Sequence, residues 1–145
     1  MPMMQRRANV IWSGDLQGSG RLTVGSNAFP EQQVTFSART EKQEGTTPEE
    51  LIAAAHATCY SMAFSNVLKQ AGSPANTLDV TAVCSLDRVE GALKITAMEL
   101  TVRGDVPGLD AAKFNELAQT AEQRCPVSNA LRGNVDVTVT ATLAS

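Results

Sequence analysis

Three cysteines and one histidine carry most of the chemical potential of this 145-residue sequence. Cys59 lies in a run of helix-forming residues, where helical spacing places it on one face with Ile52, Ala55, Met62 and Ala63. A thiol among apolar side chains is ordinarily buried and protonated, because burial disfavours the thiolate. Cys59 is therefore reactive only if the fold brings a cation to it, and an inert buried thiol is the alternative.

Cys125 has a different local setting, because Pro126 follows it directly. Proline is favoured at the first position of a helix, so Cys125 is expected at the start of a new helix, where backbone N–H groups favour a thiolate. The alternative is a small residue at a helix junction. Cys84 alternates with apolar neighbours in a predicted strand, and we interpret it as core filler.

His56 precedes Cys59 by three residues, which is within side-chain contact on a helix. It could act as a base, or bind zinc together with Cys59, Cys84 and Cys125. The sequence has no paired CxxC motif, so the zinc pattern is weak. A structural histidine is the simplest interpretation.

Two charged residues, Arg39 and Glu49, lie close to Cys59 in the sequence. Both have plain structural explanations, since Arg39 could be a solvated charge at a strand end and acids stabilise the first turn of a helix. Ten residues of continuous helix separate Glu49 from Cys59, which is about 15 Å along the axis. If Glu49 supports a site at Cys59, it comes from a partner subunit, or the helix is broken between them.

Local patterns predict the elements that position these residues. Alternation of apolar and polar residues predicts a three-stranded meander over residues 8–16, 21–24 and 33–37. Thr47, Pro48 and Glu50 then mark the start of a helix that runs to about Gln70, and Gly72 ends it. Its many alanines permit close packing and suggest burial on more than one side.

The second half of the chain predicts two strands, two helices and a closing strand. Residues 77–88 and 93–103 form a hairpin at Glu90-Gly91, and Asp110 caps a helix over residues 111–124. A short helix over 126–131 and a strand beginning at 135 complete the order βββ-α-ββ-αα-β. This order predicts an α+β fold of antiparallel sheets around a long central helix, with residues 1–145 forming a single domain.

Composition excludes several classes of protein. Hydrophobic residues make up 43% of the chain and charged residues 19%, which argues against disorder. The net charge of −3 argues against nucleic acid as the main partner. We find no apolar run of membrane-spanning length and no secretory signal, so no membrane association is expected. An odd number of cysteines indicates a reducing, cytoplasmic setting.

Two cysteine-containing blocks together resemble the OsmC/Ohr family. The stretch Gly45–Cys59, GTTPEELIAAAHATC, is similar to the family's N-P-E-E-L-x-x-A-A-H-A-x-C segment, with Thr47 in place of the usual Asn. The second block is Val106–Asp110 leading to Cys125-Pro126-Val127-Ser128. The resemblance covers roughly residues 36–143, and Phe36–Arg39 with the His56-containing helix is more similar to the OsmC branch.

The resemblance implies an intertwined homodimer with active sites at the subunit interface. It also implies a thiol-dependent peroxidase that reduces organic hydroperoxides, and hydrogen peroxide less well. By motif, Cys59 is the peroxidatic cysteine, Cys125 the resolving one, Arg39 the activating cation and Glu49 its acidic partner. Arg21 is an alternative to Arg39, in the manner of the other branch.

The implied reaction cycle uses thiols alone. A Cys59 thiolate becomes a sulfenic acid, which condenses with Cys125 to give a disulfide. An external dithiol, for which the resemblance suggests the lipoyl type, then reduces that disulfide, so no cofactor or metal is expected. The alternative is a non-catalytic stress or binding protein whose cysteines are structural.

Overall fold

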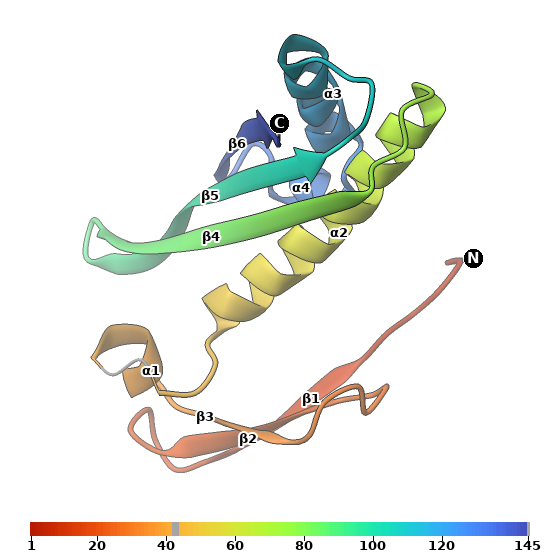
Figure 1. Ribbon diagram of the computed structural model, residues 1–145. Coiled ribbons are helices and arrows are strands. Elements are labelled where there is room, and N and C mark those ends of the chain that lie inside the picture. The colour runs from red at the N-terminus through yellow and green to blue at the C-terminus, as the bar shows by residue number, and fades with distance from the viewer. Residues whose placement is uncertain (42–43, 145) are drawn as a thin grey trace. The chain divides into compact units, whose positions relative to one another are not determined.

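The computed structural model describes residues 1–41 and 44–144. In chain order the elements are β1 (Ala8–Ser13), β2 (Ser19–Val24), β3 (Gln32–Val34), α1 (Ser37–Thr40), α2 (Pro48–Gln70), β4 (Thr77–Val89), β5 (Ala92–Asp105), α3 (Ala111–Arg124), α4 (Pro126–Leu131) and β6 (Asp136–Leu143) (Figure 1). This confirms the predicted α+β class. The chain divides into two compact units, Met1–Pro48 and Glu49–Ser145, and each is described by itself.

The first unit contains the predicted meander, in which β2 pairs antiparallel with both β1 and β3. Gly20 is paired with Trp12 on one side and with Val34 on the other. A Cβ at Gly20 would lie 2.8 Å from the Trp12 ring and 2.9 Å from the Val34 side chain. Glycine at this position therefore leaves room for two larger side chains on the same face of the sheet.

The prediction that residues 33–37 form a strand is wrong at its end. Strand β3 stops at Val34, and Ser37–Thr40 form the single helical turn α1. The Arg39 N–H donates to the Phe36 carbonyl at 3.0 Å, and the Glu41 N–H donates to the Ser37 carbonyl at 2.8 Å. These local bonds take the backbone groups that a longer strand would have paired across the sheet.

Helix α2 begins at Pro48 and ends at Gln70, as the sequence predicts. At its end, Gly72 has a φ of +84°, and the Ser73 N–H donates to the Leu68 carbonyl at 3.0 Å, as in a Schellman cap. By length and composition α2 could cross a membrane, which the sequence analysis did not anticipate. Its buried residues include Tyr60, Phe64 and Leu68, which belong to the hydrophobic core.

The second unit contains the sheet β4-β5-β6. Strands β4 and β5 form the predicted hairpin, with positive φ at both Glu90 and Gly91 as a type I′ turn requires. Strand β6 pairs with β5 in parallel, so the expectation of antiparallel pairing is wrong for this pair. Helices α3 and α4 lie between the two strands in the chain, and such a helical crossover returns the chain in the same direction.

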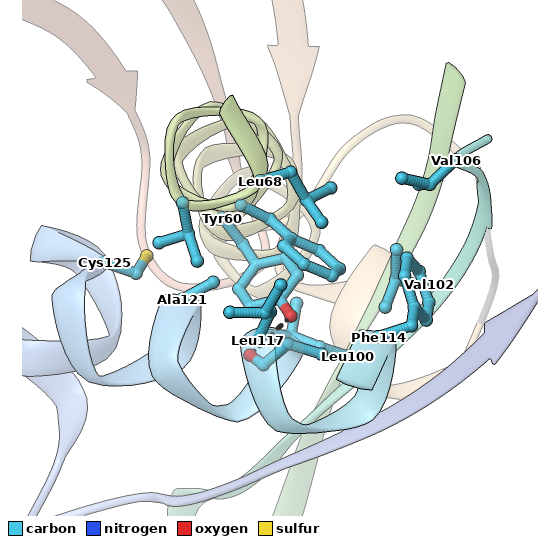
Figure 2. Packing of buried hydrophobic residues seen from close by; sticks show 12 residues of the cluster. Tyr60, Leu68, Leu100, Val102, Val106, Phe114, Leu117, Ala121 and Cys125 are labelled. Carbon is cyan, nitrogen blue, oxygen red and sulfur yellow. Dashed lines mark hydrogen bonds between the residues drawn. The ribbon is translucent and has the colours of Figure 1, made fainter. Parts of the chain in front are cut away.

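One hydrophobic core joins α2, β5 and α3 in the second unit. The rings of Phe64 and Phe114 lie 5.0 Å apart, and those of Tyr60 and Phe64 lie 5.7 Å apart. The Tyr60 hydroxyl donates to the Ala118 carbonyl at 2.8 Å, so this polar group is satisfied within the core. Figure 2 shows the Cys125 sulfur at one end of this cluster, directed towards α2.

Candidate functional site

The first candidate residue, Cys59, lies in the middle of α2 beside the buried stripe of that helix. Its side chain is half-buried and packs against the hydrophobic core. The buried positions nearest to it on α2 are His56 and Tyr60, whereas Met62 is 68% exposed. The prediction from helical spacing that Met62 shares an apolar face with Cys59 is therefore wrong for Met62. The buried face instead follows His56, Tyr60 and Phe64.

The second candidate, Cys125, is the junction between α3 and α4. Pro126 disfavours the helical conformation for the residue before it, and Cys125 has φ −75° and ψ 116°. The residue therefore ends α3 and is the N-cap of α4, which confirms its expected position at a helix start. Its sulfur is completely buried and accepts a hydrogen bond from the Ser128 N–H at 3.5 Å.

The fold brings Cys59 and Cys125 together from positions 66 residues apart in the sequence. Cys59 packs against the buried cluster to which Cys125 belongs, the two thiols influence each other, and all three cysteines of the chain are free. Burial raises the pKa of the Cys59 thiol, and the neighbouring Cys125 raises it further. A hydrogen bond to the Val127 backbone acts in the opposite direction and lowers this pKa. The fold therefore brings the two thiols into one neighbourhood, in a setting that by itself keeps Cys59 protonated.

His56 contacts the second cysteine block rather than standing apart as a lone core residue. It is fully buried, and its Nε2 lies 2.7 Å from the Ser128 Oγ. Its Nδ1 is buried without a hydrogen-bond partner among the described residues. Burial lowers the pKa of His56, and the nearby Glu122 carboxylate partly offsets this effect. The imidazole is therefore neutral near pH 7.

Ser128 is a candidate site residue in the second cysteine block, and the sequence predicted no role for it. It is fully buried and joins His56 to Cys125, through its hydroxyl on one side and its backbone N–H on the other. His56 and Ser128 are 72 residues apart, so no local spacing could have paired them. The signal available in the sequence was the position of Ser128, three residues after the predicted N-cap.

Glu49 is buried in the first turn of α2, and the helix continues unbroken to Gln70. The separation of about 15 Å from Cys59 of the same chain therefore stands, and a broken helix is excluded as the way to bring them together. Within its own unit Glu49 influences a different thiol. Burial raises the pKa of Cys84, and the charge of Glu49 raises it further.

Arg39 is half-buried in α1, in the first unit, and lines a pocket of about 260 Å³. The lining is mostly apolar and comprises Trp12, Leu16, Val34, Thr35, Phe36, Arg39 and Pro48. Arg21, the alternative cation, is exposed on β2. Alternation along β2 puts Arg21 on the sheet face opposite to Gly20 and its pocket-lining partners Trp12 and Val34. Arg39 therefore borders this pocket, whereas Arg21 does not line it.

The zinc alternative receives no support from side-chain geometry. Across residues 1–41 and 44–144, no three His, Cys, Asp or Glu side chains are grouped so that they could hold a metal ion. In the zinc hypothesis, His56 would bind the metal together with all three cysteines. Cys84 lies on β4, and the hydrogen bond of His56 Nε2 goes to a serine hydroxyl.

Comparison with known proteins identifies a family for the whole arrangement. The family model described as OsmC-like protein matches residues 40–140. The chain is 39% identical over 133 residues to peroxiredoxin OsmC of Escherichia coli, covering 91% of this chain and 93% of that protein. It is 34% identical over 121 residues to the organic hydroperoxide resistance protein OhrB of Bacillus subtilis, covering 82% and 86%.

Solved structures agree with the sequence comparison. The crystal structure of OhrB of Bacillus subtilis superimposes with a TM-score of 0.78 at 27% identity, over 97% of this chain and 100% of that one. A Legionella pneumophila protein described as an organic hydroperoxide resistance protein OsmC shares the fold, with a TM-score of 0.77 over 98% and 99% of the two chains. Together with the family match, these similarities show that the chain belongs to the OsmC-like protein family.

Proposed function

We propose that this protein is a thiol-dependent peroxidase that reduces organic hydroperoxides, and hydrogen peroxide less well. Relatives named peroxiredoxin and organic hydroperoxide resistance protein support the peroxidase class. The observation that carries the proposal is that a half-buried Cys59 packs against the buried cluster that contains Cys125, so that the two thiols influence each other. A structural role would not require two unlinked thiols from distant parts of the chain to meet.

In the proposed cycle, the Cys59 thiolate attacks one oxygen of the O–O bond, and the bond electrons leave with the alkoxide, which takes up a proton to become an alcohol. Cys59 becomes a sulfenic acid. The Cys125 sulfur then attacks the Cys59 sulfur and displaces the hydroxyl, which leaves as water after protonation. The product is a Cys59–Cys125 disulfide, and an external dithiol, for which a lipoyl-type compound is a candidate, restores both thiols.

The first step needs a positive charge, because burial and Cys125 raise the pKa of Cys59. We assign this role to Arg39, which is permanently charged and borders an apolar pocket. Glu49 is assigned as the acidic partner of Arg39. Since α2 is unbroken, the Glu49 that supports a given Cys59 would come from the partner subunit of a homodimer.

With Arg39 as the activating cation, the apolar pocket that it borders in the first unit would favour alkyl hydroperoxides. Its lining includes the apolar side chains of Trp12, Leu16, Val34 and Phe36. An alkyl group gains about 0.8 kcal/mol for each CH₂ group it buries, whereas hydrogen peroxide gains nothing from such a wall. We therefore expect kcat/KM to rise with the length of the alkyl group until the pocket is filled.

The test is peroxide consumption with cumene hydroperoxide and dithiothreitol. Cys59→Ser is expected to abolish turnover, because it removes the sulfur that attacks the peroxide. Cys125→Ser is expected to consume about one equivalent of peroxide and then to recycle poorly, since no disulfide forms. Cys84→Ser is the matched control, because it removes the third thiol of the chain, and it is expected to retain activity.

Thiol counting gives an independent outcome. One equivalent of hydroperoxide is expected to remove two thiols per chain, and peptide mapping should find Cys59 joined to Cys125. Unchanged thiol content, or full turnover by Cys59→Ser, would refute the peroxidase and leave the non-catalytic alternative.

A further inference from the structure

A short chain of hydrogen bonds leads from His56 through Ser128 to Cys125 in an otherwise apolar part of the molecule. His56 Nε2 lies 2.7 Å from the Ser128 Oγ, and the Ser128 N–H donates to the Cys125 sulfur at 3.5 Å. All three residues are completely buried. The chain connects α2 to the junction of α3 and α4, because Ser128 bonds His56 through its hydroxyl and the N-cap Cys125 through its backbone N–H.

Buried polar groups of this kind stabilise the folded state poorly. Burying an imidazole and a hydroxyl costs free energy that their mutual hydrogen bond only partly returns, and His56 Nδ1 has no partner among the described residues. Apolar side chains of similar volume would fill the same space without that cost. The unfavourable free energy of burying His56 and Ser128 therefore indicates a requirement of the reaction rather than of the fold.

We propose that His56 and Ser128 are positioning residues that hold the Ser128 N–H against the Cys125 sulfur, so that Cys125 is the leaving group when the disulfide is reduced. This inference rests on the proposed Cys59–Cys125 disulfide. Neither residue touches the peroxide in this account. In this proposal His56 anchors the Ser128 side chain, which holds the first turn of α4 in place so that the Ser128 N–H stays on the N-cap sulfur.

The two sulfurs of the disulfide are not equivalent towards an external thiol. Cys59 is half-buried, whereas Cys125 is completely buried, so an incoming thiolate meets the Cys59 sulfur first. Attack forms a bond from the reductant to Cys59 and breaks the Cys59–Cys125 bond, whose electron pair leaves on Cys125. The second thiolate of the dithiol then attacks the reductant sulfur and releases Cys59, so the dithiol is oxidised and the protein gains two electrons.

Negative charge therefore develops on Cys125 as the disulfide breaks, and the Ser128 N–H is the donor placed to stabilise it. The tautomer of His56 follows from the same geometry. An orphaned N–H is costlier than an orphaned acceptor, so we assign the proton to Nε2, which donates to the Ser128 Oγ. An imidazole ¹⁵N–¹H correlation spectrum of the reduced protein reports this tautomer directly.

The experiment separates oxidation from reduction by single-turnover kinetics. Each protein is oxidised with one equivalent of cumene hydroperoxide, and disulfide reduction by dithiothreitol is then followed. We expect His56→Asn and Ser128→Ala to slow reduction about three- to tenfold, as expected for loss of one hydrogen bond, with Cys59 oxidation unchanged. His56→Gln, whose amide nitrogen can occupy the place of Nε2, and Ser128→Thr should restore most of the rate. The double variant should be no slower than either single variant.

Thr120→Ala is the matched control, because it removes a hydroxyl of α3 that bonds the Glu116 carbonyl, away from the cysteines. The disulfide reduction potential gives a second readout. A tenfold loss in the reduction equilibrium would lower it by about 30 mV. A monothiol such as 2-mercaptoethanol should be trapped on Cys59, with Cys125 free.

The outcomes distinguish failure of the proposed peroxidase function from failure of the positioning role alone. A wild-type protein that forms no Cys59–Cys125 disulfide overturns the proposed function. A disulfide that forms normally, but is reduced at the wild-type rate in His56→Asn and Ser128→Ala, overturns the positioning role alone. Trapping of the monothiol on Cys125, or equal slowing of oxidation and reduction, also contradicts that role.

Discussion

Cys59 and Cys125 are the same amino acid in contact with each other, yet their surroundings differ. Cys59 lies within a continuous helix, where backbone N–H groups are already engaged, and burial raises its pKa. Cys125 is the N-cap of α4, with the Ser128 N–H directed at its sulfur. In the proposed cycle, these surroundings suit Cys59 to attack the peroxide and Cys125 to leave when the disulfide is reduced.

The buried His56 makes stability depend on pH. Burial lowers its pKa below the value of 6.5 expected in the unfolded chain, so the unfolded state binds more protons between these two values. The free energy of unfolding is therefore not reduced by protonation of His56 above pH 6.5 and decreases as the pH falls below that value. We expect the urea midpoint to decrease over this range, and His56→Gln to show a flatter dependence. An unchanged slope in His56→Gln would contradict a buried neutral imidazole.

Glu122 is the charged residue whose influence opposes that of burial at His56. Its carboxylate is buried and forms an ion pair with Arg132, which also donates to the Glu122 carbonyl at 3.1 Å. Removing the guanidinium would leave the carboxylate uncompensated and strengthen its effect on the imidazole. We expect Arg132→Gln to raise the pKa of His56 in an NMR titration, whereas Lys113→Gln, on an exposed ion pair, should not change it.

The packing of α3 on β5 depends on one close approach. A Cβ at Gly104 would lie 2.5 Å from the Phe114 ring, so a methyl group there must displace a fully buried side chain. We expect Gly104→Ala to lower the free energy of unfolding by about 1–3 kcal/mol, measured in urea, as overpacking does elsewhere. Phe114→Leu should recover part of this loss in the double variant, because it removes the contacting ring atoms. Additive effects of the two substitutions would show that the clash is not the cause.

Helix α2 carries both buried side chains and exposed apolar side chains. Its buried residues include His56, Tyr60 and Phe64, while Leu51 is 36% and Met62 is 68% exposed. The expectation of burial on more than one side is therefore not met by the described residues of a single chain. A second copy of the chain would cover such exposed apolar side chains, as the proposed homodimer requires.

For the whole molecule, we expect sedimentation equilibrium to give twice the chain mass of 15.3 kDa. Met62→Lys would place a charge on an exposed apolar position of α2 and is expected to weaken association. Lys69→Met, a change of comparable size near the end of the same helix, is the control. A monomeric wild-type protein with full peroxidase activity would contradict the interface site and the assignment of Glu49 to the partner subunit.

Local signals in the sequence predicted the boundaries of most elements. Pro48 and Gly72 delimit α2, Asp110 caps α3 by accepting from the Lys113 N–H at 2.8 Å, and Pro126 begins α4. Each of these residues acts on backbone within a few positions of itself, so its effect does not depend on the rest of the fold. The motif containing Cys59 and Cys125 likewise identified the family, whereas the roles assigned to all four site residues remain predictions.

Contacts between distant parts of the chain were decided by the folded molecule. The pairing of His56 with Ser128, the parallel alignment of β6 with β5 and the helical turn at Arg39 were not predicted. Each depends on which groups packing brings together after long stretches of chain have returned to the same place, and many such pairings suit the same local pattern. The sequence alone therefore determined where Cys59 and Cys125 lie along the helices. Three-dimensional packing determined that they come together, and that His56 and Ser128 lie next to Cys125.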